Sequence, residues 1–329
     1  MEELFGLRSL GKLGLRVLCL FMLLLSLVGC GEDESKIRVG VSISGIAHPD
    51  LRLIKLALEE NADEYGARIV YEKEGLAELL IDGIDVLVLN FSVPRSLELA
   101  VRNTHRKGIP VVILDCPPPQ NLHVEAYIKV NDFDAGKMAA EYVVKELGGK
   151  GNVIVLEGPR NDDIARQITL GMYSVLEQHE SIRIVASERH PNWDEDLAAD
   201  TVRATLKKYA GNVQAVLAGD SRLASGAVRA VSEHRLIDTI VTAGIGADLA
   251  ACKAIIAGKH SAEVDRMPYG RGLEALNLAT AIAKDEDFPY DAELREDEPK
   301  IKVRFGPLQL ITRENVSVMN DTWPELVSK

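Results

Sequence analysis

The sequence IDVLVLNFSVPRSLELAVRNTHRKGIPVVIL, residues 84–114, decides the fold class. It holds two short apolar runs, 84–89 and 109–114, separated by an amphipathic stretch of helical length at 97–107. A strand that is apolar at successive positions is buried on both faces, as in a parallel sheet that helices cover on each side. This stretch therefore predicts a strand, a helix and a second strand of an α/β protein.

The same alternation runs through most of the chain. Further strands are predicted at 37–43, 68–71, 127–130, 153–156, 182–186, 213–217 and 239–243. Further helices are predicted at 51–65, 135–147, 164–179, 197–209, 223–234 and 269–284, with a closing strand region at 301–311. These strands are too many for one open sheet, so we expect two lobes with a boundary near residue 131, where Asp134 can cap the next helix.

Composition excludes several classes of protein. The chain has 329 residues, 47% of them hydrophobic, so most of it can form buried cores and disorder is excluded. A formal charge of -12 argues against a nucleic-acid partner, because the field would repel phosphates. Four cysteines are too few for a disulfide-stapled fold or a zinc ribbon, and Cys116 and Cys252 are expected to be small buried hydrophobes, with a disulfide between them as the alternative.

The first thirty residues have the layout of a secretory signal. Arg8, Lys12 and Arg16 precede an apolar run at 17–28 that is too short to span a bilayer. Residues 1–29 are therefore expected to be removed. The sequence Leu-Val-Gly-Cys at 27–30 resembles a bacterial lipobox, in which Cys30 carries the lipid and 30–36 forms a tether; an ordinary signal or a buried core segment are the alternatives.

Polar side chains follow almost every predicted strand. In open parallel sheets, ligands bind beyond the carboxyl ends of the strands. Taken singly, each such residue reads as a helix cap or a solvated charge. Together, carboxylates, amides and guanidinium groups with one large aromatic suit a neutral polyhydroxylated ligand, which needs hydrogen bonds to its hydroxyls and an apolar face to stack on.

Catalytic and cofactor motifs are incomplete. Gly219-Asp220-Ser221 is similar to the nucleophile motif of GDSL-type esterases, but no histidine follows His260 to supply their base. His123-Val124-Glu125 lacks the paired cysteines of a zinc deaminase. No complete glycine-rich nucleotide motif occurs, so we expect no metal, no cofactor and no catalytic residue.

Four stretches of the sequence resemble the ribose- and xylose-binding branch of the periplasmic sugar-binding proteins. They are 50–53, 131–139, 219–227 and 244–250, and the similarity extends from about residue 37 to residue 311. The resemblance implies the type I fold, in which two doubly wound parallel-sheet lobes are joined by three crossovers, here near residues 131, 266 and 290. The first lobe would comprise 37–131 plus 267–290, and the second lobe 132–266 plus 291–329.

The resemblance also suggests roles for individual residues. Arg52 would donate to the sugar, and Trp193 would stack on it. Asp115 would accept from hydroxyls, although Cys116 replaces the arginine of the family's Asp-Arg pair. Arg266 lies near the position of a polar residue at the family's third strand crossover. The strand ends and the resemblance together nominate these ligand-binding residues: Asp50, Arg52, Asn90, Asp115, Asn161, Arg166, Trp193, Asp220 and Arg266.

Two glycines depart from the family pattern. Gly219 stands where the family has an asparagine before Asp220, and Gly246 stands where it has a pocket aspartate. Each missing acceptor would leave a buried hydroxyl unpaired at a cost of about 1–3 kcal/mol. A simple pentose is therefore expected to bind poorly.

The sequence as a whole predicts a monomeric, lipid-anchored, extracytoplasmic solute-binding protein of an ABC transporter. It would close on a small polar ligand, a sugar or a sugar-like molecule, present it to a membrane permease and perform no chemistry. The alternatives are a sensor of the same fold that feeds a chemoreceptor or a two-component kinase, and an esterase that uses Ser221. A transcription regulator would need a helix-turn-helix where this chain has its leader.

Overall fold

The computed structural model describes residues 36–327 except 44–48, 73–74, 82, 92 and 295–299. The expected signal sequence, Cys30 with its expected lipid attachment, and most of the expected tether lie outside these residues. Within the described ranges, no helix combines the length and apolar character needed to cross a membrane.

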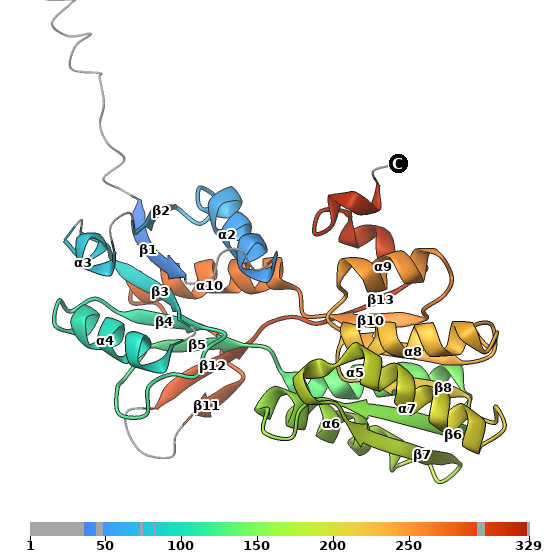
Figure 1. Ribbon diagram of the computed structural model, residues 1–329. Helices are drawn as coiled ribbons and strands as arrows, with labels where there is room; N and C mark the ends of the chain where they lie inside the picture. The colour runs from blue at the N-terminus through green and yellow to red at the C-terminus, as the bar shows by residue number, and fades with distance from the viewer. Residues whose placement is uncertain are drawn as a thin grey trace, which may run out of the picture.

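Two sheets form the centres of two lobes (Figure 1). The first sheet has the strand order β11-β12-β5-β4-β3-β1-β2, and every neighbouring pair is parallel except β11 with β12. Its strands are β1 (Ile37–Ile43), β2 (Ala67–Tyr71), β3 (Val86–Asn90), β4 (Val111–Leu114), β5 (Ala126–Lys129), β11 (Ala292–Leu294) and β12 (Ile301–Phe305).

The second sheet has the order β13-β10-β9-β8-β6-β7, and only β13 is antiparallel to its neighbour. Its strands are β6 (Gly151–Glu157), β7 (Ile182–Arg189), β8 (Ala215–Ala218), β9 (Val241–Ile245), β10 (Ala262–Asp265) and β13 (Gln309–Thr312). Both lobes are thus doubly wound, and the predicted α/β fold class is confirmed.

Helices cover both faces of each sheet. In the first lobe, α2 (Pro49–Asn61) and α10 (Pro268–Ala283) cover one face, and α3 (Leu76–Leu79) and α4 (Pro94–His105) cover the other. In the second lobe, α5 (Asp132–Glu146) and α6 (Asp163–Leu176) lie opposite α7 (Glu195–Lys208) and α8 (Ser221–Glu233). The helix α9 (Leu249–Ile256) packs beside the C-terminal 3₁₀ turns η2 (Val316–Asn320) and η3 (Pro324–Leu326).

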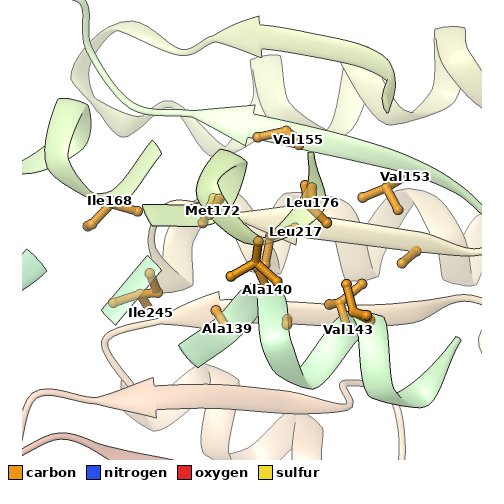
Figure 2. Close-up of a cluster of buried hydrophobic side chains, with 14 of the residues drawn as sticks. Ala139, Ala140, Val143, Val153, Val155, Ile168, Met172, Leu176, Leu217 and Ile245 are labelled. Carbon is orange, nitrogen blue, oxygen red and sulfur yellow. The ribbon is translucent and has the colours of Figure 1, made fainter. Parts of the chain in front are cut away.

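Alternate residues of one strand supply two different cores. Val153 and Val155 of β6 join the cluster under α5 and α6 that Figure 2 shows, whereas Ile154 and Leu156 join the cluster under α7 and α8. All four side chains are fully buried. This is why the strands read as continuous apolar runs rather than as alternating ones.

The chain crosses between the lobes three times. It crosses after β5, after β10, and between β12 and β13. The first two crossings lie at the predicted residues 131 and 266, but the predicted return at residue 290 is wrong. Residues 292–305 still belong to the first sheet, where β12 pairs with β5.

The sequence reading misplaces this third crossing because it treats the apolar region 301–311 as one strand. Gly306 and Pro307 divide that region between the two sheets, and proline cannot donate to a continuing ladder. The helix α9 is also missed, since its sequence LAACKAII shows no clear polar face.

Two glycines set the close packing of α5 against α6. A side-chain methyl group at Gly136 would collide with the carbonyl oxygen of Ile168, and one at Gly171 would collide with that of Phe133. The two helix backbones therefore touch at reciprocal positions, next to the crossing that enters the second lobe.

We expect Gly136→Ala to lower the free energy of unfolding by about 1–3 kcal/mol, because α5 must move away from α6. Denaturant titration followed by circular dichroism measures this. The neighbouring exposed Lys137→Ala is the control and should change stability by less than about 0.5 kcal/mol. Equal or greater stability of the Gly136 variant, as helix propensity alone would give, would contradict the close contact.

Candidate functional site

A cavity of about 470 Å³ opens between the lobes. Its walls come from the loops that follow β6, β7, β8 and β9, from the start of α2, from the crossing at 265–268 and from the C-terminal segment. The carboxyl ends of the parallel strands therefore meet here, as expected for an open α/β sheet.

Three aspartates of the cavity wall cap the helices that follow the second-lobe strands. The carboxylates of Asp162, Asp220 and Asp248 accept from the backbone N–H groups three residues on, at 3.1, 3.0 and 2.8 Å. Each cap occupies one carboxylate oxygen. Burial raises the pKa of Asp220 and of Asp248 above the ordinary value. The helix starts thus hold a row of carboxylates at the rim of the second sheet.

Arg271 of α10 is buried on the first-lobe side of the cavity and contacts several of its polar groups. Its side chain is 3% exposed, and its Nη1 donates to the carbonyl oxygen of Arg266 at 2.6 Å. Its Nε lies 3.2 Å from Asp115 Oδ1, and its Nη2 lies 3.4 Å from Asp50 Oδ2. Burial raises the pKa of Asp115 even though this guanidinium opposes the shift. The buried cation is thus paired with two carboxylates and one carbonyl, although its Nε makes no hydrogen bond of good geometry.

The second crossing contributes two side chains to the cavity. Asp265 accepts from the Met267 N–H at 3.0 Å, and burial raises its pKa to about 6. Arg266 donates to Asp132, the first residue of α5 at the end of the first crossing, over 2.7 Å. An ion pair therefore joins two of the three interlobe connections beside the cavity.

Trp193 forms an apolar wall in the second lobe. Its ring lies against the backbone of Gly158 and Gly219, where any side chain at either glycine would meet the indole. A Cβ atom at Gly219 would lie 3.2 Å from Trp193 Cζ3, so the asparagine of the family pattern would press on the indole and require it to shift.

Gly246, the second position that departs from the family pattern, also has surroundings that favour glycine. Its φ is 133°, a region that favours glycine, and a side chain there would approach Ser221 Oγ. Ser221 is buried and donates to Glu263 Oε2 at 2.8 Å, and Glu263 also accepts from the Ala247 N–H at 3.0 Å. His260 Nε2 lies 3.0 Å from the other oxygen of Glu263. The serine of the esterase-like motif is therefore part of a buried network of hydrogen bonds.

The structure brings four of the nine predicted ligand residues to the cavity. Asp50, Trp193, Asp220 and Arg266 line it. Asp115 stands behind them and reaches the cavity wall through Arg271.

The other four predicted residues are elsewhere. Arg52 is exposed on α2, because residues two apart in a helix point to different sides and Asp50 is the one that lines the cavity. Asn90 is buried, and its amide donates to the Leu114 carbonyl at 2.8 Å, between β3 and β4. Asn161 is exposed, and the exposed Arg166 pairs with Asp163 on the surface of α6.

Several cavity residues are not predicted from the sequence. Asp162 lines the cavity in place of the predicted Asn161, which it follows in the same loop, and Asp265 lines it in addition to the predicted Arg266. The C-terminal residues Met319, Thr322 and Trp323 carry no sequence signal, because only the third crossing brings them to this edge.

In the described part of the chain, no cluster of three or more histidine, cysteine or acidic side chains is arranged to hold a metal ion. Cys116 and Cys252 are free thiols in different lobes, so the alternative of a disulfide between them is wrong. Cys252 is fully buried, as expected for a small core residue.

Comparison with known proteins agrees with this architecture. The family model of the periplasmic binding protein domain matches residues 72–287. The ribose import binding protein RbsB of Haemophilus influenzae is 26% identical over 272 residues, covering 80% of this chain and 91% of that protein. The D-xylose-binding periplasmic protein of Escherichia coli is 23% identical over 315 residues, covering 91% of each.

Solved structures share the fold. The arabinose-binding protein AraP of Geobacillus stearothermophilus superposes with a TM-score of 0.71 at 18% identity, covering 86% of this chain and 99% of that chain. A periplasmic solute-binding protein of Actinobacillus succinogenes with bound D-allose gives a TM-score of 0.66 at 19% identity, covering 86% and 100%. With two lobes, three crossings and an interlobe cavity, the chain belongs to the periplasmic binding protein family, a family of solute-binding proteins rather than enzymes.

Proposed function

We propose that this protein captures a small polyhydroxylated ligand, a sugar or a sugar-like molecule, between its lobes and delivers it to an ABC permease. One observation carries the proposal. One cavity is walled by Asp50 of the first lobe, by Arg266 of the second crossing, and by carboxylates, Arg222 and two indoles of the second lobe. In keeping with it, the matched relatives are named as ribose- and xylose-binding proteins.

The cavity has the chemistry that such a ligand needs. Carboxylates accept hydrogen bonds from hydroxyl groups, the Arg266 guanidinium donates to ring or hydroxyl oxygens, and the Trp193 ring offers a flat apolar face. These groups are fixed beforehand by helix caps and ion pairs. Little conformational freedom is then lost when the ligand binds.

The ligand differs from a simple pentose in its pattern of hydrogen bonds. Gly219 and Gly246 lack two side chains of the family pattern, and the carboxylates of Asp162, Asp248 and Asp265 lie at other points of the wall. We infer a ligand whose hydroxyls are directed at the α6 and α9 helix starts and at the second crossing.

Binding works through closure of the two lobes. The three crossings are the hinge, and a ligand that touches both walls favours the closed form by its extra affinity for that form. The permease then recognises the closed form. Lipid attachment at Cys30 would keep the protein on the outer side of a bacterial membrane, near that permease.

Ligand binding is expected to raise the melting temperature and to change the intrinsic fluorescence, because both tryptophans of the chain, Trp193 and Trp323, line the cavity. A panel of pentoses, hexoses and polyols is tested by thermal shift and fluorescence titration. A ligand at a hundred times its Kd adds about 2.7 kcal/mol of stability. No response to any member of the panel would contradict a sugar-like ligand.

For a sugar found by that panel, we expect Trp193→Ala to weaken binding at least tenfold in calorimetry, since the stacking face is lost. Circular dichroism checks that the variant is folded. The control is Tyr290→Ala, which removes an exposed aromatic side chain outside the cavity and should leave the affinity unchanged. Unchanged affinity of the Trp193 variant would remove this residue from the site.

Asp265→Asn should stabilise the unliganded protein at pH 7.5 by about 1–3 kcal/mol. The folded-state pKa of about 6 exceeds the usual 3.8, so stability falls as pH rises through that interval, and asparagine removes this loss. Denaturant titrations at pH 7.5 and pH 3.5 test it, with the exposed Asp287→Asn as control. A gain of the same size at both pH values would show that ionisation of Asp265 is not its source.

Lipid attachment is tested by labelling growing bacteria that express the full chain with radioactive palmitate. We expect the wild-type protein to carry the label and to sediment with membranes, and Cys30→Ser to lose both properties. Cys19→Ser, inside the removed leader, is the matched control and should remain labelled. Label that persists in the Cys30 variant would refute this anchor.

A further inference from the structure

The C-terminal segment, residues 313–327, is fastened to the second lobe. Val316 and Met319 are buried in a small cluster with Ala247, Cys252 and Ile255 of the α9 region. In addition, the Trp323 indole N–H donates to the Ala247 carbonyl at 2.9 Å.

The point of attachment is itself held firmly. The Ala247 N–H donates to the fully buried Glu263, the carboxylate that also receives the Ser221 hydroxyl. The C-terminal segment is therefore joined through one residue to the buried network beneath the cavity wall. It must move together with the second lobe.

The same segment faces the first lobe across a second, larger cavity of about 1040 Å³. In Figure 1 it stands beside α9 and faces α2 and α10. Asp265, Pro268, Met319 and Thr322 line both cavities, so the larger one is continuous with the ligand cavity.

Apolar side chains line this larger cavity on both sides. Leu53 and Leu56 of α2 belong to the first lobe, and Val318 and Val327 belong to the C-terminal segment. Leu56 is 37% exposed, Val318 46% and Val327 63%. Two apolar surfaces that face each other in water gain free energy when they meet.

We propose that the C-terminal segment is the closure surface of the second lobe, and that its apolar side chains pack against α2 and the start of α10 when the lobes close. This inference rests on the closure included in the proposed function. The contact lies beside the ligand and not on it. The free energy of closure thus includes an apolar contribution that is the same for every ligand. The unliganded protein therefore adopts the closed form more often than it would without this segment.

The test traps the closed form without any ligand. Leu56→Cys and Val318→Cys are combined in a protein with Cys30→Ser and Cys116→Ser, and diamide is the oxidant. A disulfide requires Cβ atoms about 4 Å apart, so it forms within one chain only if the two surfaces meet. The matched control keeps Leu56→Cys and places the second cysteine at Ile256 instead of Val318. Ile256 is 44% exposed on α9 but does not line this cavity.

We expect the Leu56–Val318 pair to form an intramolecular disulfide at least tenfold faster than the control pair, followed on non-reducing gels and by mass spectrometry. The oxidised protein should have a smaller radius of gyration in solution scattering than the reduced one. A second pair, Leu56→Cys with Val327→Cys, repeats the test. Rates equal to the control for both pairs, or only intermolecular disulfides, would overturn the proposal.

Failure of this inference can be told apart from failure of the proposed function. If neither pair forms a disulfide while a sugar of the panel still raises the melting temperature, the proposed sugar binding stands and the proposed role of the C-terminal segment in closure is refuted. If the disulfides form but no sugar has an effect, closure remains and the ligand class is wrong.

Discussion

The arrangement of the cavity depends on the hydrogen bond and ion pairs that the buried Arg271 guanidinium makes. This arginine lies on a first-lobe helix, yet it binds the Arg266 carbonyl of the second crossing as well as Asp50 and Asp115 of the first lobe. A charge buried this deeply is tolerated only when all of its partners are in place. The position of the second crossing relative to the first sheet is thereby fixed, and with it the placement of Asp265 in the cavity.

Backbone contacts restrict the opposite wall in the same way. Gly219 lies under Trp193, and Gly246 lies against Ser221 at a φ of 133°, so a larger residue at either position would require a shift or a strained backbone. The proposed function therefore assigns ligand specificity to residues that project from helix starts and from the crossing.

The fold could be predicted from the sequence because buried parallel strands give apolar runs that local reading detects. The third crossing could not, since Gly306 and Pro307 divide one apolar region between two sheets. The candidate site could be predicted in part, since Asp50, Trp193, Asp220 and Arg266 line the cavity but Asn161 does not. Whether Asn161 or Asp162 points inward depends on which of them caps α6, and the contribution of Trp323 depends on a long-range contact with Ala247. Such contacts leave no periodic pattern in the sequence.

The proposed function requires that one ligand is held by both lobes in the cavity bounded by Trp193, Asp220 and Asp265. A crystal structure of the protein grown with the sugar that most raises its melting temperature tests this most directly. We expect the sugar to lie against the Trp193 ring, to form hydrogen bonds with groups of both lobes, and to be enclosed by them. A sugar bound outside this cavity, or in contact with only one lobe, would contradict it.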